Sequence, residues 1–203
     1  MTDQQPRRPH LRGDWGQTPC PLGADEPGAR RELAHATASA VLAAGRGDAD
    51  RVDGLLRVAE SVGLAELAEL WRDAGPRTLP GALWTLYLLR TWCRLQGEDA
   101  ARLFRAGRTV ADVPAAVAGV QEPPGPRDIA DLGDAVLRGA YEGDFAVALE
   151  RAAAFSRVVS AGRVALAGDT AEGQDQLRLA AGNLTCAEQL EDSARAWREG
   201  ALH

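Results

Sequence analysis

Arg90 and Arg94 are the residues best suited by type and spacing to bind a ligand. They lie four positions apart, so on a helix they share one side of the most apolar stretch of the chain. Two guanidinium groups in a groove can receive a phosphate or a partner's carboxylate. The favoured alternative is that their stems lie along apolar surface while the guanidinium groups pair with a carboxylate or reach water. A ligand pocket beside this stretch would be lined by Arg90, Arg94, Trp84, Tyr87 and Trp92.

Two further groups of residues are suited to contact a partner macromolecule. Leu11 and Trp15 lie in the proline-rich N-terminal segment, where a tryptophan either docks on its own domain, the slightly preferred interpretation, or binds a partner. A transcription-associated regulator would contact DNA or polymerase through Arg102, Arg105 and Arg108. The net charge of -6 argues against nucleic acid, because DNA-binding surfaces normally show a basic excess.

The histidines and acidic residues do not complete a metal site. Glu32 and His35 have the Glu-x-x-His spacing of helical di-iron sites, but such sites need a second copy and two more glutamates. The other histidines, His10 and His203, lie near ends that we expect to be flexible. We therefore expect no metal and no cofactor, and a helical role for His35. Three aspartates at three-residue steps are expected to form a solvated helix face: Asp128, Asp131 and Asp134.

No arrangement typical of a catalytic site is present in the sequence. All 23 basic residues are arginine, which excludes a Schiff-base lysine and a phosphate-loop lysine. No serine lies in a G-x-S-x-G context, and there is no G-x-G-x-x-G motif. Cys93 and Cys186 lie in helical patterns and are expected to be buried thiols. The sequence names no catalytic residue and favours a non-catalytic protein, while leaving enzymatic activity open.

The stretch 81–96 is the predicted centre of the fold. On a helix its apolar residues spread almost all the way round, which is typical of a buried or a membrane-spanning helix. It is shorter than the roughly 20 apolar residues that a bilayer requires, and the two arginines interrupt it. The buried alternative is therefore preferred, with Pro80 tolerated in the first turn.

Composition predicts an all-α, bacterial-type domain. Alanine and leucine dominate, and β-branched and aromatic residues are scarce. We expect a single-domain bundle of about eight or nine helices over 29–203, preceded by an extended or disordered arm, 1–28. Proline-rich residues 121–126 join two subassemblies, 29–120 and 127–203. The sequence shows no signal peptide and no spanning segment, so the expected location is cytoplasmic.

The C-terminal part is expected to end in a long antiparallel helical hairpin. Asp169 and Glu172 have the spacing of residues that cap the start of the last helix. The apolar stripe of that helix is expected to run from Leu177 to Trp197 through these residues: Leu177, Ala181, Leu184, Ala187, Leu190, Ala194 and Trp197.

Gly-Asp pairs precede several predicted helices, as at Gly143-Asp144. The segment YEGDFAVALERAAAF, residues 141–155, resembles the turn and second helix of a tetratricopeptide hairpin, which implies an irregular stack of hairpins as the alternative fold. The Gly-Asp pairs do not recur at the regular spacing of about 34 residues in that family.

These observations favour a non-catalytic helical interaction or scaffold protein that binds a protein partner. The first alternative is a protein, or a cryptic enzyme, that binds a small anion or nucleotide beside 81–96. The second alternative is the transcription-associated regulator.

Overall fold

The computed structural model describes residues 27–45, 64–110 and 125–203, which form seven helices and no strand. The predicted all-α class is therefore confirmed. No helix in these ranges is long and apolar enough to cross a membrane. The helices are α1 (Pro27–Gly45), α3 (Leu64–Trp71), α4 (Leu79–Leu95), α5 (Gly97–Arg108), α6 (Pro126–Glu142), α7 (Phe145–Leu166) and α8 (Ala171–Arg198).

The described residues contain fewer helices than the eight or nine predicted from the sequence. Two of the helices counted in that prediction, one near 50–62 and one near 109–118, lie wholly or mostly outside the described residues, as does most of 121–126. The division of the chain at 121–126 therefore stays a prediction. One core cluster nevertheless contains side chains from both sides of that segment, among them Leu83 of α4 and Leu149 of α7.

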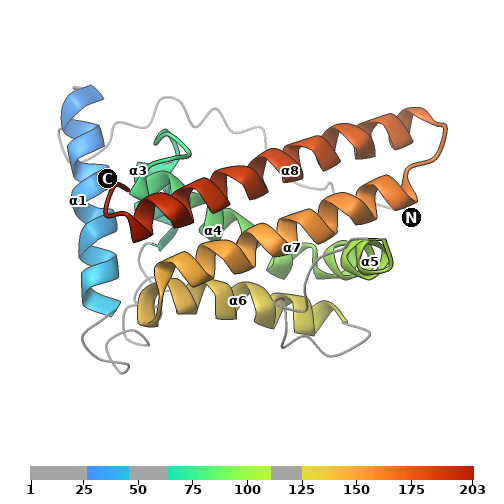
Figure 1. The fold of residues 1–203 in the computed structure, drawn as a ribbon, viewed down its shortest axis with the longest axis horizontal. Coiled ribbons are helices and arrows are strands. Elements are labelled where there is room, and N and C mark those ends of the chain that lie inside the picture. The colour runs from blue at the N-terminus through green and yellow to red at the C-terminus, as the bar shows by residue number, and fades with distance from the viewer. Residues whose placement is uncertain (1–26, 46–63, 111–124) are drawn as a thin grey trace, which may run out of the picture.

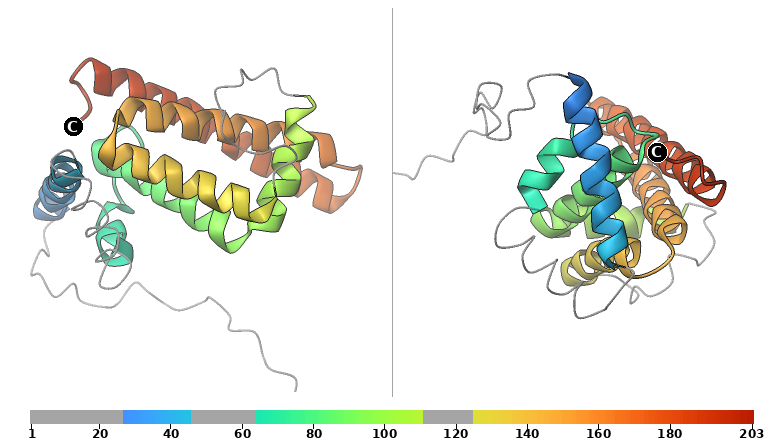
Figure 2. Two further views of the ribbon diagram at one scale, coloured as in Figure 1. Left: turned by 90° about the horizontal axis from the view of Figure 1, so that it is seen from below. Right: turned by 90° about the vertical axis from the view of Figure 1, so that its left-hand side faces the viewer.

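Four long helices, α4, α6, α7 and α8, lie lengthwise beside one another (Figures 1 and 2). Helices α1 and α3 cover one end of this group, and α5 crosses the other end, where Figure 1 shows it nearly end-on. A second core cluster at the α5 end contains Phe104 of α5, Ile129 of α6 and Phe155 of α7. The rings of Phe104 and Phe155 are stacked with their centroids 5.4 Å apart.

Helix α4 is buried on most of its surface but not all round. The hydroxyl oxygen of Thr78 accepts a hydrogen bond from Gly81 N at 3.3 Å and caps the helix, and Pro80 occupies its first turn as predicted. Leu83 and Leu86 are fully buried, whereas Leu88 is 45% exposed. The prediction of a helix covered on every side is wrong for this face, because the described residues cover it only in part.

The C-terminal hairpin is present as predicted, with α7 and α8 antiparallel and in extensive contact (Figure 1). The carboxylate of Asp144 accepts a hydrogen bond from Ala146 N at 2.9 Å and caps α7. Thr170 caps α8 by accepting one from Gly173 N at 3.1 Å, so the predicted capping residue, Asp169, is one position too early. A threonine has the same capping geometry as an aspartate, and the sequence offered both side by side.

The apolar stripe predicted for α8 does not all face the core. Ala187 and Leu190 are buried, but Leu177 is 48% exposed and Leu184 is 39% exposed. The prediction is wrong for this half because several of its steps are three residues long, and each such step turns the stripe back by about 60°. The residues of α8 that are buried in this half are instead Gly173 and Ala180.

Helices α5 and α7 cross at a contact between two glycines. A Cβ atom on Gly162 would lie 1.9 Å from the carbonyl oxygen of Leu103, and one on Gly107 would lie 1.8 Å from that of Val158. No side chain is tolerated at that distance, so the backbones meet only because both residues are glycine. This crossing positions α5 against the half of α7 that leads into the connecting loop.

Candidate functional site

Arg90 and Arg94 both face Asp134 of α6. The Nε of Arg90 donates to Oδ1 of Asp134 at 2.6 Å, and Nη1 of Arg94 lies 3.8 Å from the same oxygen. The side chain of Arg90 is only 13% exposed. This geometry matches the favoured interpretation, in which the guanidinium groups pair with a neighbouring carboxylate. The use of the two arginines in ligand binding stays a prediction.

The aromatic residues expected in the same pocket lie elsewhere around α4. Trp84 and Tyr87 stack with their ring centroids 5.7 Å apart and pack against the larger core cluster. Trp92 packs against Phe155 of α7, with centroids 6.2 Å apart. Residues two positions apart on a helix are rotated by about 200° about its axis, so Arg90 and Trp92 point to nearly opposite sides. The structure therefore does not bring the five predicted residues together around one pocket.

The three aspartates of α6 have separate roles. Asp128 accepts a hydrogen bond from Gly125 N at 2.8 Å at the start of the helix, Asp134 binds the arginines of α4, and Asp131 is exposed. No three histidine, cysteine or acidic side chains are grouped to hold a metal ion anywhere in the described ranges.

A polar cluster missed by the sequence analysis lies where α4, α7 and α8 meet. Arg163 of α7 donates from Nε to Oδ1 of Asn183 at 2.9 Å and from Nη1 to Oε1 of Gln176 at 2.7 Å, both on α8. Its guanidinium carbon lies 5.9 Å from the centroid of the Trp92 ring, a cation–π contact. The indole Nε1 of Trp92 donates to Oε1 of Gln96 at 3.2 Å. We call Arg163, Trp92, Gln176 and Asn183 the Arg163 cluster.

Burial affects the pKa of Arg163 more than the neighbouring charges do. Desolvation lowers the pKa of Arg163 most, Asp99 of α5 raises it and Arg102 lowers it. An arginine nevertheless stays charged in proteins. No carboxylate of the described residues lies within 4 Å of this guanidinium. The sequence did carry a signal: Arg163 falls between Val159 and Leu166, within the apolar periodicity of α7.

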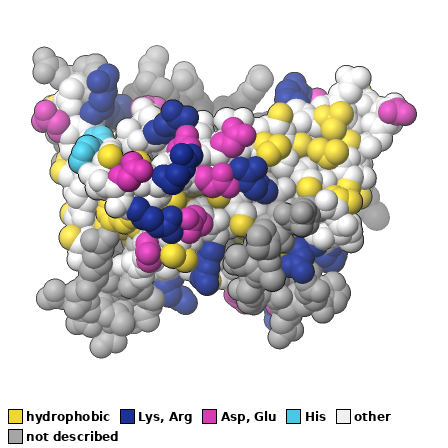
Figure 3. All heavy atoms as spheres, viewed as in Figure 1, with side chains coloured by type: hydrophobic (Ala, Val, Ile, Leu, Met, Phe, Trp, Pro, Cys, Tyr) yellow, Lys and Arg dark blue, Asp and Glu magenta, His cyan; other side chains and the backbone are white. Residues whose placement is uncertain are grey.

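Exposed apolar side chains gather at the loop end of the hairpin. Nine large apolar residues of the described ranges are exposed, and five of them lie there: Val164, Leu166, Leu177, Leu179 and Leu184. Figure 3 shows apolar side chains over this half of the visible face and charged side chains over the other half. We call the group formed by Val164, Leu177, Leu184 and exposed Ala181 the apolar strip.

The apolar strip continues the register of two ion pairs. Glu150 of α7 binds Arg198 of α8, with Oε2 and Nη2 2.9 Å apart, and Arg157 binds Glu191, with Nη2 and Oε2 2.7 Å apart. These pairs are seven residues apart on each helix. The next step of seven reaches Val164 on α7 and Leu184 on α8, so exposed apolar residues occupy the positions equivalent to the charged ones.

A hollow of about 480 Å³ lies between α1, the start of α4 and the C-terminal tail. After α8 ends at Arg198, Gly200 turns the chain back with a φ of 68° and an N–H bond to Trp197 O at 3.1 Å. Leu202 is then buried, and His203 O accepts from Leu79 N at 3.1 Å. His203 is therefore held in place, in contrast to the expected flexible end. The hollow is lined by His35, Ser39, Leu42, Ala43, Leu79, Trp197, Leu202 and His203.

The residues predicted to contact a partner are only partly within the described ranges. Arg102, Arg105 and Arg108 are exposed on α5, and Arg102 lies 3.5 Å from Asp99 in an ion pair. Leu11 and Trp15 lie outside the described residues. Their roles in partner binding stay predictions.

Both described cysteines have thiols whose ionisation is disfavoured. Burial, and then the charge of Asp134, raises the pKa of Cys93 to about 12. Burial also raises the pKa of Cys186, although a hydrogen bond with Ser156 opposes it. Neither thiol is activated as a nucleophile, because the thiolate is the reactive form.

Comparisons with protein-family models, curated proteins and solved structures found no match to this chain.

Proposed function

We propose that this protein is a non-catalytic interaction protein that binds an amphipathic helix of a partner protein along the apolar strip. The observation that carries the proposal is the exposure of Val164 (53%), Leu177 (48%) and Leu184 (39%) on adjacent helices. Contiguous apolar surface of this kind marks interaction sites on soluble proteins.

The register of the hairpin supports a helix as the bound element. The ion pairs of Glu150 and Arg157 cover the junction of α7 and α8 with charge, as flanking positions of helical hairpins usually do. The apolar residues at the equivalent positions of the next turns leave the junction open to a third helix. A helix laid along this junction would contact it through apolar residues at positions i, i+3 or i+4 and i+7.

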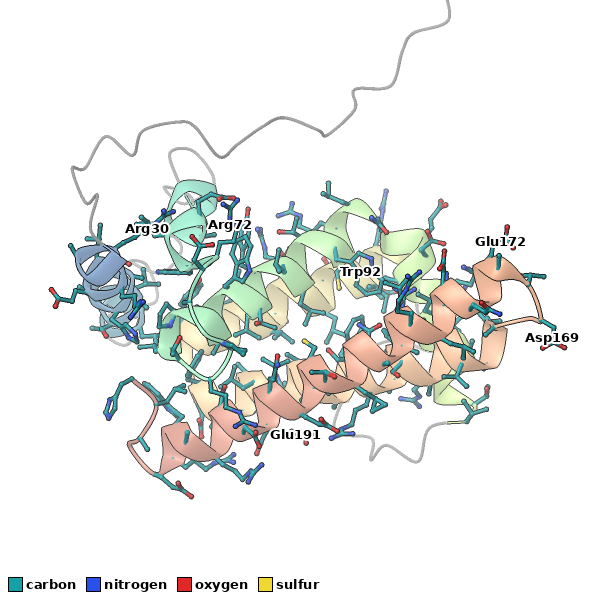
Figure 4. All side chains as sticks on the ribbon, turned by 90° about the horizontal axis from the view of Figure 1, so that it is seen from above. Arg30, Arg72, Trp92, Asp169, Glu172 and Glu191 are labelled. Carbon is teal, nitrogen blue, oxygen red and sulfur yellow. The ribbon has the colours of Figure 1, made fainter. Side chains whose placement is uncertain are left out.

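The charges beside the apolar strip indicate the chemistry of the partner. Asp169 and Glu172 lie at the end of the hairpin and point away from its body (Figure 4). A hydrogen bond from its own backbone N–H, and then one from Thr170, lower the pKa of Glu172, so this carboxylate is negative at neutral pH. A partner helix with arginine or lysine at the end beside this loop would complement both acids.

The proposal is tested with a synthetic amphipathic peptide that carries leucine at heptad positions a and d and arginine at one end. Fluorescence anisotropy measures its binding to the full chain and to Val164→Glu. The charge is expected to raise the dissociation constant at least about tenfold, since it lies at the centre of the contact.

Val147→Glu is the matched control, because Val147 is 39% exposed on the same helix and lies far from the apolar strip. Its dissociation constant is expected to stay within about twofold of the unmodified chain. Equal weakening by both substitutions, or no binding to the unmodified chain, would count against the proposal.

The other parts of this proposal rest on the sequence. A cytoplasmic location and a contribution of Leu11 and Trp15 to partner binding remain part of it. The apolar strip on α7 and α8 would serve the same purpose in a helical bundle and in an irregular stack of tetratricopeptide-like hairpins.

A further inference from the structure

Arg163 is a half-buried cation whose hydrogen-bond acceptors are uncharged. Charged groups that are withdrawn from water are normally paired with an opposite charge. Arg90 follows this rule through Asp134, but Arg163 bonds to the carboxamide oxygens of Gln176 and Asn183. The positive charge of Arg163 is therefore held in place without being neutralised by a direct contact.

The side chains of the Arg163 cluster have more hydrogen-bond donors than acceptors. A guanidinium group has five N–H donors and no acceptor, and Nη2 of Arg163 makes no hydrogen bond to the described residues. Because a guanidinium only donates, the amides of Gln176 and Asn183 must turn their oxygens toward it. Their NH₂ groups, two donors each, consequently face away from Arg163.

These remaining donors are open to solvent. In the described part of the chain no buried side-chain nitrogen or oxygen lacks a hydrogen-bond partner. The NH₂ groups of Gln176 and Asn183 and the Nη2 of Arg163 therefore reach water, because they have no hydrogen-bond partner among the described residues. Figure 4 shows Trp92, which lies against the guanidinium, in the space between α4 and α8 and on the opposite side of α8 from Glu191.

We propose that the Arg163 cluster is a binding site for the oxyanion group, a carboxylate or a phosphate, of a small molecule. Nη2 of Arg163 offers its N–H donors and the positive charge to either group, and the NH₂ groups of Gln176 and Asn183 are further donors on the two amides that hold the guanidinium. The Trp92 ring supports one face of the guanidinium and limits its movement. Asp99 of α5 raises the pKa of Arg163 and Arg102 of α5 lowers it, so charges of both signs lie near the cluster.

The test follows the indole N–H of Trp92 by NMR in the full chain, assigned with Trp92→Phe. Sodium phosphate and sodium acetate are titrated separately, with sodium chloride at equal ionic strength as the reference. A saturable shift with phosphate or acetate and none with chloride is expected, and the two arms identify the preferred oxyanion. The absence of a saturable shift with both anions, or an equal shift with chloride, overturns the proposal.

Two substitutions separate binding from folding. Arg163→Gln is expected to raise the dissociation constant at least about tenfold, as loss of a charge-assisted hydrogen bond does. Asn183→Asp gives Arg163 a carboxylate of the same shape, so we expect a higher Tm and loss of the phosphate or acetate response. Arg178→Gln is the control, because Arg178 is exposed on α8 and pairs with Asp175. An unchanged anion response in Asn183→Asp overturns the proposal, even if Arg163→Gln does not fold.

Discussion

The two halves of the α7–α8 hairpin follow the same seven-residue register but distribute apolar and polar residues in opposite ways between the interior and the surface. In the half near the chain end, the interior is mostly apolar, with Phe145 and Trp197 in edge contact at 5.0 Å, and the flank carries ion pairs. In the half near the connecting loop, the interior holds Arg163 and its two amides, while Val164 and Leu184 are exposed. The first half has the pattern that stabilises a fold, with apolar residues inside and charged residues outside. The second half departs from that pattern at the residues that we propose bind a partner helix and an oxyanion, and such departures are expected at functional sites.

The largest difference between the halves is expected from leucine truncation. Leu190→Ala, in the interior of the first half at 2% exposure, should cost about 3 kcal/mol of unfolding free energy, because it leaves a cavity. Leu184→Ala, in the second half, should cost less than about 1 kcal/mol, since its side chain is already partly in water. Urea denaturation of both variants measures the difference, and equal losses would mean that the apolar strip is packed in solution.

The glycine crossing tests whether the second half is fixed rigidly against α5. Gly162→Ala places a Cβ 1.9 Å from Leu103 O and should destabilise the protein by about 2–3 kcal/mol, because the backbones must separate. Gly182→Ala is the matched control on α8, where no atom lies within 4 Å of the new Cβ. It should be neutral or stabilising by up to about 1 kcal/mol, as expected for alanine in a helix. A loss of similar size in both variants would contradict the described crossing.

The ion pairs of the first half should contribute the smallest effect, and one that depends on pH. Hydrogen bonds from Arg198 and Arg157, respectively, lower the pKa of Glu150 and Glu191. A lowered folded-state pKa stabilises the protein above the unfolded-state value, and this stabilisation is lost as the pH falls through the folded-state value. Both pairs are partly exposed to solvent, which screens the attraction, so each should contribute only a small stabilisation.

Thermal melts of Glu150→Gln/Glu191→Gln and the unmodified chain check this pH dependence. Their Tm values should differ at pH 7 and converge below the ordinary glutamate pKa of 4.5. Glu32→Gln on α1, at an exposed position, is the control and should show no such convergence. A Tm difference that persists in acid would show that the charges are not its cause.

The sequence predicted the elements of the hairpin better than the direction of its side chains. The local sequence is sufficient to predict that α7 begins after Asp144 and ends at Leu166. The exposure of Leu177 could not be predicted, because which side of α8 faces α7 depends on contacts between helices. The same limit applies to Arg163, whose neighbours on α4 and α8 are distant in sequence. Arg90 was singled out correctly as unusual, but its partner, Asp134, is known only from the fold.

The most direct test of the opposite polarity of the two halves is the double substitution Leu177→Gln/Leu184→Gln. Urea denaturation and binding of the amphipathic peptide are measured on the same preparation. If the exposed leucines serve binding rather than folding, the unfolding free energy should change by less than about 1 kcal/mol while peptide binding is lost. A loss of several kcal/mol, or unchanged peptide binding at full stability, would contradict the assignment of this half of the hairpin to partner recognition.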